Sequence, residues 1–215
     1  MKIAVICSDA AHPINSHLEH WAAKHSGKRI VEIVGRKREL RGGDILFLVS
    51  CTELLTTADL QAYRVVLVLH ASDLPDGRGW SPHIWQIIGG AEKIVLTLLE
   101  ASESVDSGRI WKKTTIPVPR HALWDEINEL LFAAEIELMD LAIEQYGLID
   151  PIDQPHGSIG TYYARRTPED SRLDIEKSIS DQFDLMRVCD PNRFPAFFEI
   201  HGHRYAIRLE KINES

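Results

Sequence analysis

The sequence predicts an α/β fold: a Rossmann-like core with a mostly parallel sheet flanked by helices. The first observation is a series of short apolar runs of strand length, at residues 3–7, 29–34, 44–49, 65–69 and 94–99. Strands that are apolar on both faces are typical of parallel sheets covered by helices on both sides. The second observation is that segments with apolar residues every three or four positions, typical of amphipathic helices, accompany these runs.

Composition sets the broad class. A chain of 215 residues with 44% hydrophobic and 26% charged residues predicts a soluble globular protein of one main domain with a small appendage. The net charge of −8 argues against a nucleic-acid partner. Three scattered cysteines show no metal or disulfide spacing, which favours a reducing compartment. The apolar start is too short for a signal peptide and no segment is long enough to span a membrane, so we expect a cytoplasmic protein without a membrane partner.

The first elements form a Rossmann-like opening. Strand 3–7 is followed by a polar loop and by a helix over residues 15–24, in which Leu18 and Trp21 lie on the apolar face. The loop has no Gly-x-Gly-x-x-Gly fingerprint, so a nicotinamide cofactor is not expected. Strands 29–34 and 44–49 come next, separated by a basic loop that we interpret as solvated.

The strongest signal follows the strand at 65–69. The strand ends at His70 and breaks into a loop rich in proline and glycine, and open α/β sheets hold their ligands at the carboxyl ends of strands. A short helix (84–88) and the strand at 94–99 then lead to a loop that carries Asp106. If these two strands are neighbours, His70 and Asp106 converge on the same edge of the sheet. This pair is the predicted chemical centre.

The remaining chain predicts one long helix and a smaller tail. Apolar residues recur at helical spacing from Leu123 to Leu141, and Gly147 is an expected left-handed cap. The turn-rich stretch 151–155 marks a predicted boundary between a catalytic core (1–150) and a C-terminal extension (151–215) that contributes to acceptor binding. A helix over 175–187 and a hairpin pairing 196–200 with 204–209 are expected in the extension.

Several separated motifs resemble one family. They are His70-x-Ser72-x-Leu74-Pro75, Arg78-Gly79, Ser81-Pro82-x-x-Trp85, Gly89, Val95-x-Thr97 and Val105-Asp106-x-Gly108-x-Ile110. In order and spacing they resemble the core of the formyltransferases that use 10-formyltetrahydrofolate, most closely the sugar N-formyltransferase branch. The segment 161–174 resembles the one that these enzymes place after their long helix.

The resemblance implies an N-formyltransferase with 10-formyltetrahydrofolate as donor and tetrahydrofolate as product. It implies His70 and Asp106 as the catalytic residues. Expected folate contacts are Cys51, Glu53, Leu54, Ser72, Leu74, Pro75, Val105 and Asp106. Expected acceptor contacts are Arg78, Gly79, Trp80, Arg166, Arg187, Asn192 and Phe197.

The acceptor implied by the resemblance is a nucleotide-linked amino sugar. The guanidinium fork of arginine suits a pyrophosphate, which makes Arg78, Arg166 and Arg187 the candidates, with Asn192 or Phe197 at the base. The variant Gly-Arg-Gly-Trp-Ser-Pro at 77–82 resembles the branch that acts on UDP-linked 4-amino-4,6-dideoxy sugars in pseudaminic acid synthesis. The specific expectation is a UDP-4-amino-4,6-dideoxy-N-acetylhexosamine. The chain lacks the larger carboxy-terminal barrel of methionyl-tRNA formyltransferases, so a tRNA acceptor is not expected.

One position departs from the family. The usual core reads Asn-x-His, with the asparagine thought to hydrogen-bond the formyl oxygen, and Val68 occupies that position here. Losing such a donor typically lowers the rate by roughly a hundred- to a thousand-fold. Protonated His70, a backbone amide or Thr97 could replace it; alternatively, the enzyme is slow or the fold has been reused. We favour replacement, because His70 and Asp106 are both present.

The expected mechanism needs no metal. An uncharged amine attacks the formyl carbon, Asp106 orients His70, and His70 takes up or relays a proton. The histidine pairs at 17/20 and 201/203 lack carboxylate or cysteine companions at ligand spacing. Two rival classes stay open: a formyltetrahydrofolate hydrolase, and a non-catalytic folate- or nucleotide-binding module. The oligomeric state also stays open, with a homodimer as one arrangement.

Overall fold

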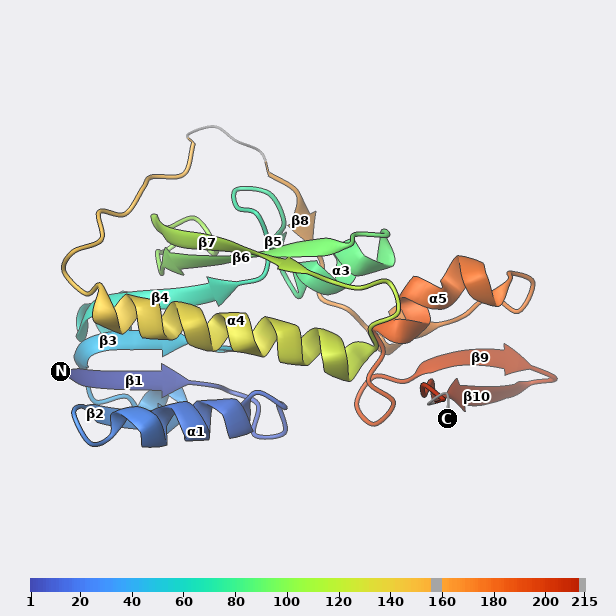
Figure 1. Ribbon diagram of the computed structural model, residues 1–215, viewed down its shortest axis with the longest axis horizontal. Helices are drawn as coiled ribbons and strands as arrows, with labels where there is room; N and C mark the ends of the chain where they lie inside the picture. The colour runs from blue at the N-terminus through green and yellow to red at the C-terminus, as the bar shows by residue number, and fades with distance from the viewer. Residues whose placement is uncertain (156–159, 213–215) are drawn as a thin grey trace.

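The computed structural model describes residues 1–155 and 160–212. At its centre lies a six-stranded sheet of order β2-β1-β3-β4-β6-β7 (Figure 1). The strands are β1 (Lys2–Ile6), β2 (Ile30–Val34), β3 (Gly43–Leu48), β4 (Tyr63–His70), β6 (Lys93–Glu100) and β7 (Ile110–Pro117). Strands β1 to β4 pair in parallel, whereas β6 and β7 are antiparallel to their neighbours. The predicted Rossmann-like α/β class with a mostly parallel sheet is confirmed.

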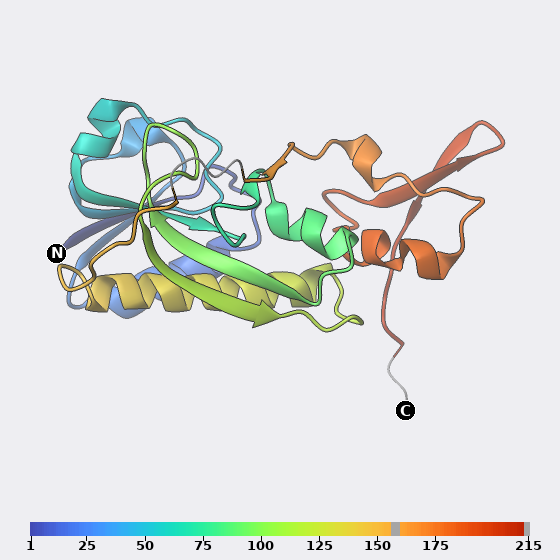
Figure 2. The same cartoon turned by 90° about the horizontal axis from the view of Figure 1, so that it is seen from above.

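Two helices cover one face of the sheet. Helix α1 (Asn15–His25) and helix α4 (Trp124–Glu144) lie on this side, while the short helix α2 (Thr57–Gln61) lies on the other (Figure 2). The α1–α4 contact is fastened at Asp140, whose carboxylate accepts a hydrogen bond of 2.6 Å from the Trp21 indole and lies 2.8 Å from Nε2 of His25. Helix α4 begins and ends close to the positions that its apolar spacing predicts.

The apolar core is divided by the sheet. Alternate residues of each central strand point to opposite faces, so Leu67 packs under α1 and α4 while Val66 packs on the α2 side. Burying one such aliphatic side chain contributes about 1.5–3 kcal/mol. By the same alternation, Val68 and His70 share the α2 face with Val66. His70, the last residue of β4, therefore lies on the α2 side of the sheet, where the apolar cluster is the smaller of the two.

The direction of β6 differs from the expectation. Strands β4 and β6 are neighbours, as predicted, but they run antiparallel: His70 pairs with Thr97, and Leu67 pairs with Glu100. The carboxyl end of β6 therefore lies three residues back from His70, not beside it. The loop 101–109 has to return along the sheet to bring Asp106 to the histidine.

Strand β7 was not predicted from the sequence. Its residues are mostly half-buried and include Lys112 and Lys113, so the segment lacks the continuous apolar run of a central strand. Charged residues, lysine above all, are typical of edge strands, where they discourage pairing with another chain. The apolar pattern of β7 is therefore weak because β7 is an edge strand of the sheet.

The remaining elements belong to the site loop and the tail. They are β5 (Arg78–Gly79), α3 (Pro82–Ile88), β8 (Tyr162–Tyr163), a 3-10 turn at Pro168–Ser171, α5 (Ile179–Arg187), β9 (Ala196–Ile200) and β10 (His203–Ile207). A second 3-10 turn, Lys37–Glu39, lies between β2 and β3. The expected hairpin is present and turns at His201 and Gly202, both at positive φ. The tail helix begins at Ile179, later than predicted, because Ser178 caps it by accepting a hydrogen bond from the Asp181 amide.

The hairpin of β9 and β10 stands away from the main sheet (Figure 1). The division into a core (1–150) and an extension (151–215) stays a prediction, and residues 156–159 and 213–215 of that extension lie outside the described residues. Within residues 1–155 and 160–212, no helix combines the length and the apolar character needed to cross a membrane.

Candidate functional site

The structure brings His70 and Asp106 together. Nδ1 of His70 lies 3.5 Å from Oδ1 of Asp106, and the two side chains are only 8% and 7% exposed. On the other side of the ring, Nε2 lies 2.8 Å from the carbonyl oxygen of Gly77. Both ring nitrogens therefore face oxygen acceptors. A neutral imidazole can donate to one of them only, whereas a protonated ring can donate to both, so the ring can take up a proton with the carboxylate beside it.

A long loop carries Asp106 back to the histidine. Asp106 itself has a positive φ of 55°, and its Oδ2 accepts a hydrogen bond of 3.0 Å from the Gly79 amide. Gln154 donates from Nε2 to the carbonyl oxygens of Asp106 and Gly108, at 3.0 and 2.8 Å. Gly108 is required where the loop passes Glu100, because a Cβ there would lie 1.9 Å from the Glu100 carbonyl oxygen. Gln154 is a supporting residue that sequence reasoning missed.

The ladder between β5 and β8 fixes the loop that follows His70. The Arg78 amide donates to the Thr161 carbonyl at 2.9 Å, and the Gly77 amide donates to the Thr161 hydroxyl at 2.9 Å. Gly79 allows the two segments to meet, since a Cβ there would lie 2.3 Å from the Tyr163 carbonyl oxygen. The C-terminal extension thus holds the backbone of the histidine loop in place.

The predicted folate residues have different environments. Leu54 and Val105 expose their apolar side chains, at 77% and 57%. Leu74 is buried, with its carbonyl oxygen accepting a hydrogen bond from Lys113, and Pro75 is half-buried. Ser72 is buried, and its hydroxyl has no partner among the described residues.

Two further predicted folate residues are held by the protein. Glu53 accepts a hydrogen bond of 2.7 Å from the Lys37 amide and lies 3.5 Å from Arg36. The half-buried Cys51 thiol contacts the Glu53 carbonyl oxygen at 3.5 Å. Burial raises the pKa of this thiol, so it stays neutral. These contacts shape the loop after β3, and a folate contact at either residue stays a prediction.

Part of the predicted acceptor set gathers around the β5–β8 ladder. Arg165 lies over the Trp80 ring at 5.0 Å, and Arg166 lies over Trp85 at 5.9 Å. The Trp85 ring also stacks on Tyr163 of β8, with centroids 6.4 Å apart. Arg78, half-buried, has an Nε that is buried without a partner among the described residues, as has Arg166. Arginine and aromatic side chains are thus concentrated on this side of the site.

Arg187 does not fit its predicted role. It is 1% exposed, and its guanidinium donates to Asp184 at 2.6 Å and to the carbonyl oxygens of Pro119 and Ala122 at 3.2 and 3.3 Å. These contacts fasten α5 to the segment before α4. In this structure the buried guanidinium of Arg187 is engaged by the protein at Nε and Nη1, which argues against its predicted pyrophosphate contact.

The predicted base contacts also change. Phe197 is 4% exposed, and Arg204 covers its ring at 4.0 Å, so the ring cannot stack on a base in this structure. Asn192 is exposed, with its Oδ1 accepting a hydrogen bond of 3.0 Å from Arg208. Of the two candidates, only Asn192 presents a side chain to solvent.

Two more histidines, His12 and His83, lie near the site. Burial lowers the pKa of His83 to about 4, with the charges of His70, His12 and Arg166 acting in the same direction. The Nδ1 atom of His83 is buried and has no partner in the described part of the chain. His83 was not expected at the site, because an isolated histidine carries no spacing signal. The described residues contain no group of three or more metal-ligating side chains, and the metal-free site stays a prediction.

The central part of the chain is similar to a known protein family. Residues 39–143, which include His70 and Asp106, match the family model described as formyl transferase. This part of the chain is thus similar to a formyl transferase domain. The chain is also similar to the methionyl-tRNA formyltransferase of Sorangium cellulosum, with 30% identity over 149 residues, which is 68% of this chain and 48% of that protein. It spans about half the length of the curated relatives it matches.

Solved structures agree on the fold. A methionyl-tRNA formyltransferase from Clostridium thermocellum superposes with a TM-score of 0.83 at 18% identity, over 99% of this chain and 94% of that one. A sugar N-formyltransferase from a Shewanella species gives 0.72 at 14% identity, over 100% and 99%. HypX from Aquifex aeolicus, solved with tetrahydrofolic acid, gives 0.76 at 21% identity, over 95% and 36%. The formyl transferase family uses 10-formyltetrahydrofolate, and folate is the cofactor to test here.

Proposed function

We propose that this chain transfers the formyl group of 10-formyltetrahydrofolate to the amine of a nucleotide-linked amino sugar. The observation that carries the proposal is the buried contact between His70 and Asp106 at the carboxyl end of β4, inside the segment that matches the formyl transferase family model. A buried carboxylate beside an imidazole is a suitable arrangement for moving a proton during acyl transfer. The residues named above as expected folate contacts are the proposed donor site.

The chemistry follows from these two side chains. The uncharged amine of the acceptor attacks the formyl carbon, and a tetrahedral intermediate forms with a negative charge on the formyl oxygen. The amine nitrogen loses a proton, the bond between the formyl carbon and N10 of the folate breaks, and N10 takes up a proton. For this transfer Nε2 of His70 exchanges the Gly77 carbonyl oxygen for the substrate nitrogens. His70 then carries the proton between the two nitrogens, while Asp106 stabilises the ring when it is charged. The products are a formamide and tetrahydrofolate.

The acceptor side is proposed from charge and from resemblance. Arg78, Gly79, Trp80 and Arg166 are the proposed site for a pyrophosphate attached to a flat base, with the rings of Trp80 and Trp85 beside Arg165 and Arg166. The Gly-Arg-Gly-Trp-Ser-Pro loop favours a UDP-linked 4-amino-4,6-dideoxy-N-acetylhexosamine. A methionyl-tRNA acceptor is the second candidate, because the curated relatives carry that name.

The test is a panel of acceptors with one donor. Purified protein is incubated with 10-formyltetrahydrofolate and, in separate samples, UDP- and dTDP-linked amino sugars, initiator methionyl-tRNA, or no acceptor. Mass spectrometry detects the added formyl group, and absorbance follows the folate. We expect formylation of an amino sugar nucleotide. Formate release independent of any acceptor would instead indicate a hydrolase, and folate binding without turnover would indicate a binding module.

A further inference from the structure

The formyl oxygen needs a hydrogen-bond donor, and β4 does not supply one from its side chains. Val68, two residues before His70, has no polar atom. The Thr97 hydroxyl, a candidate replacement, donates to the Ser72 carbonyl oxygen at 2.6 Å and is buried. The nitrogens of His70 face Gly77 and Asp106. A separate donor at this edge of the sheet would complete the site.

The neighbouring strand places a serine at this edge. Leu48, the last residue of β3, pairs with Val68 of β4 in parallel register, and Ser50 follows Leu48 by two residues, as His70 follows Val68. Ser50 is exposed and has a positive φ of 47°, a conformation that costs a serine roughly 1–3 kcal/mol and that clusters at functional sites. Its carbonyl oxygen accepts a hydrogen bond of 3.3 Å from the Ser8 hydroxyl, which helps to hold the turn.

His12 leaves the Ser50 hydroxyl with a proton to donate. The Ile14 amide donates to Nδ1 of His12 at 3.3 Å, so in the neutral ring the proton is on Nε2. Nε2 lies 3.0 Å from the Ser50 hydroxyl oxygen and donates to it. The serine oxygen thus acts as an acceptor toward His12. Its own O–H has no acceptor among the described residues and remains available to a ligand.

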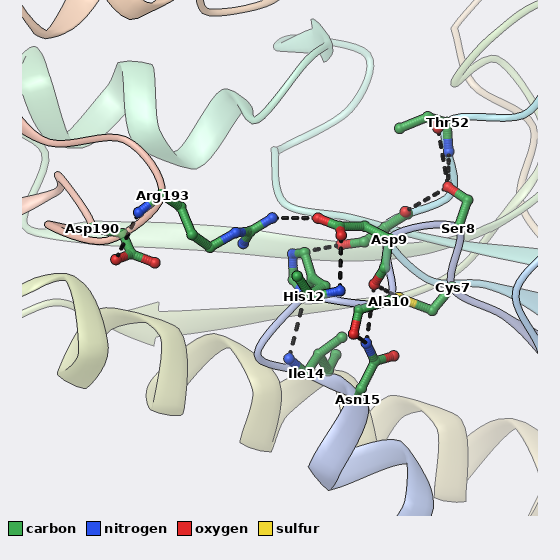
Figure 3. Close-up of polar contacts among 12 residues, drawn as sticks. Cys7, Ser8, Asp9, Ala10, His12, Ile14, Asn15, Thr52, Asp190 and Arg193 are labelled. Carbon is green, nitrogen blue, oxygen red and sulfur yellow. Dashed lines mark hydrogen bonds and ion pairs between the residues drawn. The ribbon is translucent and has the colours of Figure 1, made fainter.

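The loop that carries His12 is locked in place. Figure 3 shows Arg193, from the C-terminal extension, paired with the carboxylate of Asp9, next to His12. The other oxygen of Asp9 accepts a hydrogen bond of 2.9 Å from the Ala11 amide. On its opposite side the His12 ring packs against Phe132 of α4, with centroids 5.7 Å apart. Burial and the charge of Arg193 lower the pKa of His12 to about 4, against the opposing effect of Asp9. The ring is therefore neutral at neutral pH.

We propose that the Ser50 hydroxyl donates a hydrogen bond to the formyl oxygen and replaces the asparagine that is absent at Val68, with His12 as the residue that positions it. This inference rests on the proposed function and adds a residue to its site. The hydroxyl stabilises the negative charge that develops on the formyl oxygen when the amine attacks. No proton needs to leave Ser50, because a neutral donor suffices.

The first test compares two hydroxyl deletions on the same loop. Ser50→Ala removes the proposed donor, whereas Thr52→Ala removes a hydroxyl that contacts Ser8 at 3.0 Å and not His12. We expect Ser50→Ala to lower kcat by about a hundred-fold, the scale of one lost oxyanion donor, and to raise the KM for the folate by no more than about five-fold, the scale of one ground-state hydrogen bond. Thr52→Ala should keep the wild-type kcat. A Ser50→Ala enzyme as fast as Thr52→Ala would overturn the proposal.

The second test separates positioning from folding. His12→Gln keeps a side-chain amide that can donate to Ser50, whereas His12→Leu cannot. The glutamine variant should retain most of kcat, and the leucine variant should approach Ser50→Ala in both kcat and folate KM. Equal losses in kcat for both variants would contradict the positioning role.

A binding measurement distinguishes failure of this inference from failure of the proposed function. Affinities are measured for a non-reactive folate analogue with a formyl group on N10 and for the same analogue without it. Wild type should prefer the formyl compound, and Ser50→Ala should lose about five-fold of that preference, the scale of one hydrogen bond. An unchanged preference in Ser50→Ala refutes the inference alone. Absence of binding to either compound in the wild type refutes both.

Discussion

The residues predicted for the site lie differently at the strand ends and in the C-terminal tail. At the strand ends, His70 and Asp106 meet in a buried contact, although the loop that carries Asp106 has to fold back along an antiparallel strand. In the tail, Arg187 and Phe197, chosen from the same resemblance, lie inside the protein and are engaged by other residues. Sheet topology limits where a residue at a strand end can lie. An arginine or phenylalanine on a helix or hairpin has no such constraint.

The largest effect is expected at Asp106. Asp106→Asn keeps an oxygen that can accept from the Gly79 amide but removes the charge that stabilises protonated His70. We expect a loss of kcat of at least about a hundred-fold, the scale of a lost acid–base partner, with the melting temperature nearly unchanged. A steady-state assay and a thermal melt measure both quantities. A clear drop in melting temperature with activity intact would make Asp106 a structural carboxylate.

Two arginines of the tail, Arg187 and Arg166, are expected to differ in their effects on stability and on acceptor binding. Arg187→Met leaves two main-chain carbonyl oxygens without their donor, and we expect the free energy of unfolding to fall by about 2 kcal/mol. Arg166 donates to the Asp170 carbonyl oxygen and the Ser171 hydroxyl at 3.2 and 3.0 Å, so Arg166→Met should lower the free energy of unfolding by about 1 kcal/mol and raise the KM for the acceptor. Urea denaturation and kinetics on both variants test this contrast. If Arg187→Met unfolds like wild type and only binds the acceptor less tightly, our correction of its role is wrong.

Glu135 provides a pH test that involves neither region. This buried carboxyl on α4 has a pKa raised to about 8 by burial, whereas in the unfolded chain it ionises near its ordinary value. Between those two pKa values the folded state binds more protons than the unfolded state. The free energy of unfolding therefore falls as the pH rises toward 8 and levels off above it. Wild type should therefore lose about 1 kcal/mol between pH 7 and 8 relative to Glu135→Gln. Identical pH dependence of unfolding in the two proteins would show that Glu135 is ionised in the fold.

Gln154 should have the smallest effect. Gln154→Ala removes the two hydrogen bonds that hold the loop of Asp106, and it leaves His70 untouched. We expect kcat to fall several-fold, with a loss of stability of about 1 kcal/mol. Gln154→Glu, which keeps the length of the side chain but cannot donate, is the matched variant and should behave like Gln154→Ala. Wild-type kcat in both variants would mean that the loop holds its shape without Gln154.

The fold was largely predictable because apolar periodicity reports burial directly. Strands β1 to β4, β6 and helix α4 follow from that pattern, whereas β7 does not, because an edge strand with lysines is not apolar. The pairing of His70 with Asp106 was predictable from neighbouring strands, but the antiparallel direction of β6 was not, since strand direction leaves no trace in a short apolar run. The support of Asp106 by Gln154 and the contact between Ser50 and His12 were not predictable, because each joins segments that are distant in the sequence.

The most direct test of the central claim is a single-turnover measurement that follows both products in the same sample. Wild type and His70→Asn are mixed with 10-formyltetrahydrofolate and the best acceptor of the panel, and tetrahydrofolate and formylated acceptor are quantified over time. The account predicts one formylated acceptor for each tetrahydrofolate in the wild type, and neither product above background in His70→Asn with its fold intact. Equal rates in the two proteins, or tetrahydrofolate with formate and no formylated acceptor, would contradict it.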